Sequence, residues 1–221
     1  MFSGGDYPER DRECATSFGQ AGKTAGLPRI VYLGAIQPDG DERSEHLGSR
    51  VETGRLLADH TPTLALRAGP LIGSGSAAFE MCRYLTERLP VMLTPRWIDI
   101  PVRTIAIRTV LAYLVAALED DATGVMDVGT EPLTFRDMMR IYAEVRQLRP
   151  RLILPTPMLA PGLAARWVGL VTPITNDLAV PLVKGMCDPI LGDTRFARER
   201  YPDIEPVSYR RAVALAIARI E

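Results

Sequence analysis

The run Arg29-Ile30-Val31-Tyr32-Leu33-Gly34 decides the expected fold. It places four apolar residues between an arginine and a glycine, and a short apolar run of this kind is typical of a strand that is buried on both faces of a parallel sheet. Small and apolar residues recur at helical spacing over residues 9–25, so we expect a helix before the strand. Gly26-Leu27-Pro28 ends that helix.

The chain continues as an alternation of helices and strands. A second helix has Leu47, Val51, Gly54 and Leu57 on one face. Residues 63–66, Thr-Leu-Ala-Leu, form the expected next strand. Helix, strand, helix and strand in succession require crossover connections, which favour a mostly parallel sheet with helices packed on it. The sequence therefore predicts an α/β fold.

The regular alternation of helices and strands ends after Gly69-Pro70. We expect a Gly/Ser loop, a helix over residues 78–89 and then a proline-rich stretch over residues 90–101 that covers a ligand cleft. The further elements expected are a strand at 103–107, an apolar helix at 108–118, a short strand at 124–129, and a helix capped by Thr134.

The composition narrows the class of protein. The 221 residues hold 26 Lys plus Arg against 27 Asp plus Glu, which gives no electrostatic footprint for nucleic acid. Cys14, Cys82 and Cys187 are odd in number and not near either histidine, so we expect reduced thiols and no metal site. The first residues lack the pattern of a signal peptide, and no stretch approaches the roughly 20 apolar residues that span a bilayer. We expect a cytoplasmic protein without a transmembrane segment.

One expected motif of nucleotide-binding folds is missing from the sequence. No Gly-x-Gly-x-x-Gly joins a strand to a helix, so there is no pyrophosphate-binding turn. The nearest candidate runs from Gly69 to Ser76 and lies between a strand and a helix. It lacks the lysine of a phosphate-binding loop and its glycines have the wrong spacing, so we interpret it as a turn that leaves the sheet.

Several segments together resemble the extended short-chain dehydrogenases/reductases. Residues 29–34, the helix that follows, and residues 66–73 are similar to strand 5, the active-site helix and strand 6 of that family. Residues 101–118 resemble its substrate-domain strand and helix, and residues 126–134 its late segment before a helix. The resemblance covers residues 9–150 and is strongest to the atypical members, which include NmrA-like sensors and the 39 kDa accessory subunit of respiratory complex I.

The resemblance implies a partial Rossmann-type fold, doubly wound and mostly parallel. Residues 1–75 would be the C-terminal half of an NAD(P)-binding Rossmann domain without its first strands. Residues 76–221 would be a substrate-domain-like α/β and helical region, interleaved with the last Rossmann strands. We interpret the sequence as N-terminally truncated, through a misassigned start, a real loss or a deliberate fragment. We expect the intact protein to bind NAD or NADP, and this chain to bind it weakly or not at all.

The resemblance also assigns catalytic positions. Residues 44–50 lie where the family has Tyr-x-x-x-Lys, so His46 takes the place of the proton-donating tyrosine and Arg50 that of the lysine that holds the nicotinamide ribose. Neither substitution keeps the mechanism, although His46 can carry a proton near neutral pH and Arg50 can bind a ribose or a phosphate. The family's active-site serine is also missing, because the strand ends in Gly34-Ala35. The alternative for His46 and Arg50 is a solvated helix start beside Glu45.

The cofactor contacts that the resemblance implies lie at the ends of two strands and on the helix between them. They are Gly34, Ala35, Arg50, Arg67, Ala68 and Gly69. For Arg67 the alternative is a strand-end arginine that pairs with a surface carboxylate.

Two classes of function stay open on these grounds. The first is an NAD(P)-binding oxidoreductase-like or epimerase-like protein without standard Tyr-Lys catalysis, acting on a small molecule that the sequence does not identify. The second is a non-enzymatic structural, assembly or redox-sensing subunit. Without an inner neighbour, the strand over residues 30–33 would be an exposed edge, so we expect a homodimer or a place in a larger complex.

Overall fold

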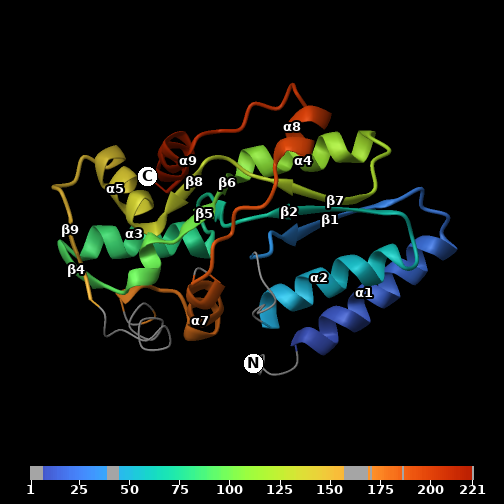
Figure 1. Ribbon diagram of the computed structural model, residues 1–221, viewed down its shortest axis with the longest axis horizontal. Coiled ribbons are helices and arrows are strands. Elements are labelled where there is room, and N and C mark those ends of the chain that lie inside the picture. Colours follow the sequence, from blue (N-terminus) through green and yellow to red (C-terminus); the bar gives the residue numbers. More distant parts are fainter. Residues whose placement is uncertain (1–6, 39–44, 157–168, 170, 186, 221) are drawn as a thin grey trace.

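The computed structural model describes residues 7–38, 45–156, 169, 171–185 and 187–220. A three-stranded parallel sheet in the order β1-β2-β7 organises its first part (Figure 1). The strands are β1 (Ile30–Ala35), β2 (Thr63–Ala68) and β7 (Gly124–Val128). Each coincides with a run that the sequence marks as a strand, so the α/β prediction with a mostly parallel sheet is confirmed.

Helices cover both faces of this sheet (Figure 1). One face carries α1 (Tyr7–Thr24) and α2 (Glu45–Ala58), and the other carries α4 (Ile107–Glu119) and α8 (Arg195–Arg200). This cover explains the nearly continuous apolar run of the central strand β2, whereas β1 is half-buried over most of its length and Val125 of β7 is 56% exposed. The sheet is doubly wound, as predicted.

Strand alternation decides which side chains meet which helix layer. Leu64 and Leu66 of β2 are completely buried and pack with Tyr113 of α4. Successive strand residues point to opposite faces, so Ala65 and Arg67 point toward the α2 side. β1 lies at one edge of the sheet in the described part of the chain, where it pairs with β2 alone.

The remaining elements pack around a second and larger hydrophobic core. Its helices are α3 (Ala77–Arg88), α5 (Phe135–Val145), α7 (Asn176–Gly185) and α9 (Tyr209–Ile217), with a 3-10 turn at Arg96–Asp99. Its strands form three pairs: β3 (Leu71–Ile72) with β6 (Ile105–Ala106), β4 (Val91–Thr94) with β9 (Leu152–Pro155), and β5 (Pro101–Arg103) with β8 (Pro132–Thr134).

In this second part of the chain the predicted cap of α5 is confirmed, and the strand predicted at residues 103–107 is wrong. Thr134 caps α5 in a capping box, in which its side chain accepts from the Asp137 amide and the Asp137 carboxylate accepts from the Thr134 amide. The single strand expected at 103–107 is wrong, because β5 and β6 pair with different partners there. The carbonyl of the intervening Thr104 accepts from both the amide and the hydroxyl of Thr130.

The chain returns to the first sheet after leaving it, because β7 lies well beyond residue 75. The division at residue 75 stays a prediction. None of the described helices combines the length and the hydropathy that crossing a bilayer requires. Within the described ranges, no cluster of three or more His, Cys, Asp or Glu residues is placed to hold a metal ion.

Candidate functional site

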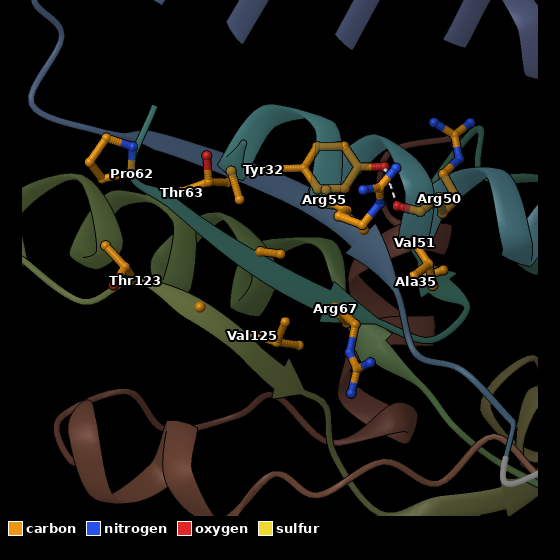
Figure 2. Close-up of a pocket in the computed structure, with 15 residues that line it drawn as sticks. Tyr32, Ala35, Arg50, Val51, Arg55, Pro62, Thr63, Arg67, Thr123 and Val125 are labelled. Carbon is orange, nitrogen blue, oxygen red and sulfur yellow. Dashed lines mark hydrogen bonds between the residues drawn. The ribbon is translucent and has the colours of Figure 1, made fainter. Parts of the chain in front are cut away.

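A groove of about 530 Å³ lies on the α2 side of the sheet and brings together four of the six predicted cofactor contacts (Figure 2). The four are Gly34, Ala35, Arg50 and Arg67. Its other lining residues are Tyr32, Val51, Gly54, Arg55, Ala58, Pro62, Thr63, Ala65, Thr123, Gly124 and Val125. Three arginines therefore stand around a lining that is otherwise mostly apolar or small.

The groove exists because the sheet carries small side chains on this face. Gly34, Ala65 and Gly124 leave room above the strands, and Gly54 lets α2 approach them. Tyr32 is the exception, and its ring lies near the positions that a Cβ would take at Gly34 (3.1 Å) and at Gly54 (3.5 Å). The Tyr32 hydroxyl donates to the Arg50 carbonyl at 3.3 Å, which ties β1 to α2 (Figure 2).

The cations of the groove differ in how they are engaged. The Arg50 guanidinium is half-buried, and no residue in the described part of the chain forms a hydrogen bond or an ion pair with it. Within the described residues, Arg55 makes a single long and exposed contact, of 3.4 Å with Asp59. Among the described residues, Arg50 is thus a cation of this groove that is available to an anionic ligand.

Arg67 is committed to a bidentate ion pair across two strands. Its Nε lies 2.6 Å from Oδ1 of Asp127, and its Nη2 lies 3.0 Å from Oδ2. The Asp127 side chain is only 6% exposed, against 30% for Arg67. The amide of Asp193 also donates to Asp127 at 3.0 Å. The alternative stated for Arg67, pairing with a carboxylate, is what the structure shows, although the carboxylate is buried and not on the surface.

Packing contacts account for the residue types at Ala68, the last residue of β2, and at Gly69, which follows it. Ala68 is buried among the residues between the sheet and α4. A Cβ on Gly69 would lie 1.9 Å from the carbonyl oxygen of Arg103, a distance that no side chain can occupy. Neither residue lines the groove. Their predicted contact with a cofactor stays a prediction.

His46 lies in the first turn of α2, one helical turn before Arg50. Its side chain lies outside the described part of the structure. The spacing of four residues puts the two positions on the same side of the helix. The catalytic role of His46 stays a prediction.

Sequence reasoning missed the Asp127 half of the ion pair, although a signal was present. Asp127 is the charged residue of the run Val-Met-Asp-Val, and a carboxylate in a buried strand requires a partner. Arg67 is its direct neighbour in the register of β2 and β7. The sequence signals that Asp127 needs a partner, but it does not identify Arg67, because the pairing depends on the register of the two strands.

A second pocket, also of about 530 Å³, lies on the segment that joins α8 to α9. Arg103 lines it and donates to the carbonyls of Leu191 (2.5 Å) and Thr130 (2.6 Å). The side chain of Arg103 crosses Gly129, where a Cβ would lie 2.6 Å from it. None of the predicted site residues lines this pocket. The two hydrogen bonds of Arg103 join β5 to the segments that contain Thr130 and Leu191.

Comparison with known proteins supports the fold alone. No protein-family model matches the chain. No curated protein matches it either. Among solved structures, the WbmH enzyme of Bordetella bronchiseptica in complex with NAD⁺ has a TM-score of 0.65 at 14% identity, over 92% of this chain and 66% of its own. UDP-glucuronic acid 4-epimerase from Bacillus cereus in complex with NAD gives 0.66 at 12%, over 93% and 65%.

The dTDP-4-dehydrorhamnose reductase of Bacillus anthracis in complex with NADP has a TM-score of 0.67 at 10% identity, over 98% of this chain and 77% of its own. The chain therefore spans about two thirds to three quarters of the length of these enzymes. At such low identity the likeness extends to architecture, and the NmrA-like and complex I assignments stay predictions. The chain has the partial Rossmann-like α/β fold that the resemblance implies.

Proposed function

We propose that the chain belongs to an NAD(P)-binding protein of the short-chain dehydrogenase/reductase type, either oxidoreductase-like or epimerase-like. The observation that carries the proposal is the groove that Gly34 and Ala35, at the carboxyl end of β1, share with Arg50 of α2. Open α/β sheets bind their ligands outside these strand ends. Solved structures of the same fold hold NAD or NADP.

The described residues fit one part of such a cofactor. The Arg50 guanidinium, which has no ion-pair partner among the described residues, suits a phosphate or a ribose hydroxyl. The sequence contains no pyrophosphate-binding turn, so the 221-residue chain should bind NAD(P) with a dissociation constant above about 10 μM. When bound, NAD(P) supplies hydride transfer.

His46 is the proposed proton carrier of this site. An imidazole titrates near neutral pH, so it can give a proton to a substrate oxygen or take one from it. The tyrosine of the family is absent from this position, because the sequence places His46 there. The substrate is proposed to be a small molecule, and the location of the protein is proposed to be cytoplasmic.

A non-enzymatic function is the second candidate, and one observation favours it. The strand end offers Gly34 and Ala35 where a carbonyl-orienting hydroxyl would be needed, and the nearby Arg67 is already held by Asp127. A site with these residues can hold a nucleotide without turning over a substrate. In that case the protein would be a structural, assembly or redox-sensing subunit.

Backbone-amide NMR titration with NADH tests the proposed site. We expect progressive, weak shifts of the amides of Gly34, Ala35 and Arg50, and a loss of those shifts in Arg50→Ala. The matched control is Arg55→Ala, which removes a guanidinium from the same helix and the same groove. Shifts that are absent at saturating NADH, or that survive in Arg50→Ala, would refute the assignment.

The enzyme and binding candidates separate in a second assay. Turnover of NAD(P)H with a panel of aldehydes and ketones, lost in His46→Ala while the Arg50 amide still shifts with NADH, would establish the catalytic candidate. Nucleotide binding without turnover, unchanged in His46→Ala, would establish the non-enzymatic one.

A further inference from the structure

The outer face of the β4–β9 strand pair is apolar and exposed to solvent. The two strands are parallel, with Val91 opposite Leu152 and Leu93 opposite Leu154. The exposed fractions are 54% for Val91, 62% for Leu93, 52% for Leu152 and 41% for Leu154. The side chains that alternate with them are buried in the larger core. We call the four exposed residues the β4–β9 face, and a contiguous apolar face of this kind marks an interaction surface.

Arginines flank the β4–β9 face at both ends. Residues 88–98 and 145–156, which contain the two strands, include five arginines and no aspartate or glutamate. Arg88, Arg149 and Arg151 precede the strands, and Arg96 follows the carboxyl end of β4. In the described part of the chain, no carboxylate forms an ion pair with any of these four. The described residues therefore leave this positive charge without a counterion.

The acidic residues nearest in the sequence do not change this balance. Those that border the two segments already form ion pairs with other arginines, and they are Glu87, Asp99 and Glu144. Arg88 and Arg151 donate to backbone carbonyls, which leaves their charge in place. Arg96 and Arg149 are exposed, and neither forms a hydrogen bond with a described residue. Their guanidiniums are available to an anionic partner.

The position and the size of the β4–β9 face favour a membrane surface over a second protein. Figure 1 shows the strand pair at one end of the long axis of the molecule, with α1 and β1 toward the other end. A stable protein interface buries about 800 Å² on each partner, which is more than four half-exposed aliphatic side chains provide. Two copies packed through this face would also bring arginines against arginines, because arginines lie at both ends of it.

We propose that the β4–β9 face binds the surface of a membrane that contains anionic phospholipids. Its four aliphatic side chains enter the boundary between headgroups and acyl chains, and the flanking guanidiniums bind lipid phosphates. An apolar surface beside basic residues is characteristic of proteins that lie on a membrane without crossing it. None of the four residues lines the groove around Arg50, so membrane binding does not depend on what that groove holds.

Vesicle flotation tests the role of the charges. The 221-residue chain should float with vesicles of equal parts phosphatidylcholine and phosphatidylglycerol, and it should not float with phosphatidylcholine alone. Arg96→Gln with Arg149→Gln should weaken binding at least about tenfold, because each arginine near an anionic surface contributes about fivefold. The matched control is Arg10→Gln with Arg198→Gln, which removes exposed arginines from α1 and α8 and should bind like the wild type.

A second pair of variants tests the apolar contact. Leu93→Gln with Leu154→Gln should weaken binding to the anionic vesicles at least about tenfold, because both side chains lose their transfer out of water. Phe18→Gln with Phe196→Gln changes similarly exposed apolar residues on α1 and α8, and it should leave binding unchanged. Circular dichroism checks that all variants are folded. In anionic bicelles, a spin-labelled lipid should broaden the methyl signals of the β4–β9 face most strongly.

Three results would overturn the proposal. The first is a wild type that fails to float with the anionic vesicles, or that floats equally with both kinds. The second is a loss of binding in the control variants that equals the loss in the variants of the β4–β9 face. The third comes from analytical ultracentrifugation: a wild-type dimer that Leu93→Gln with Leu154→Gln converts to a monomer would assign the face to a second copy of the chain.

Discussion

Arg67 and Asp127 stand directly opposite each other in the register of β2 and β7, and both oxygens of the carboxylate accept from the guanidinium. The pair closes the carboxyl end of the sheet at the same edge as Gly34 and Ala35. Because Asp127 is nearly buried, the pair has to be kept or removed as a unit.

Removal of one partner of this pair should be far more harmful than removal of both. We expect Arg67→Ala to lower the free energy of unfolding by about 3–5 kcal/mol, because it leaves an uncompensated buried carboxylate. The double variant Arg67→Met with Asp127→Leu should recover most of that loss. Urea unfolding followed by circular dichroism measures both, with the exposed Arg55→Ala as control. A double variant as unstable as the single one would contradict this account.

Gly69 should not tolerate a side chain. A methyl group at this position would meet the Arg103 carbonyl at 1.9 Å, so Gly69→Ala should destabilise the protein by about 2 kcal/mol or more. The matched control is Gly48→Ala in α2, where a Cβ meets nothing within 4 Å. That change should stabilise the helix by about 0.5–1 kcal/mol. The melting temperatures of the two variants test this. If both change in the same direction, the close approach at Gly69 is not rigid.

The three cysteines should react with a thiol reagent in a fixed order. Cys14 is exposed, Cys187 is half-buried with a pKa raised by burial and by Asp188, and burial raises the pKa of Cys82 to about 12. A raised thiol pKa means less thiolate, which is the reactive form, at any pH below it. At pH 8 we expect Cys14 to react first, Cys187 slowly, and Cys82 only after unfolding. Mass spectrometry after timed alkylation checks the order.

The edge position of β1 should appear in hydrogen exchange. β1 pairs with β2 alone in the described sheet, whereas β2 has a partner on each side. Amides of β1 that point away from β2 should therefore exchange faster than those of Leu64 to Leu66. Equal protection of the two strands in a monomer would mean that another segment covers this edge.

The sequence predicts the central sheet well because three short apolar runs each suit burial on both faces. Register is a different matter. Nothing in the run at 124–128 states that Asp127 will face Arg67, because register depends on where all three strands end. The prediction of a single strand at 103–107 fails for a similar reason. β5 and β6 pair with two different strands, which the local sequence cannot show.

The functional site was also predicted only in part, because contacts between distant segments cannot be derived from local sequence. Resemblance located Gly34, Ala35, Arg50 and Arg67, which the structure brings to one groove. It could not reveal that Ala68 turns into the core or that Gly69 is fixed by the carbonyl of Arg103, because both depend on contacts between distant segments. Helical periodicity predicted an apolar α4, yet it could not show that part of that apolar surface faces outward.

The hydrogen bond from the Asp193 amide to Asp127 has a consequence for the order in which the chain is made. All three strands of the sheet have been synthesised once residue 128 is added, yet this carboxylate gains its last donor only when residue 193 arrives. Ala197, which packs beneath the same sheet, arrives later still. A nascent chain that stops between these points would have α4 in place but would lack the cover that α8 gives to the same face, and a ribosome that pauses there would expose this part of the sheet to aggregation.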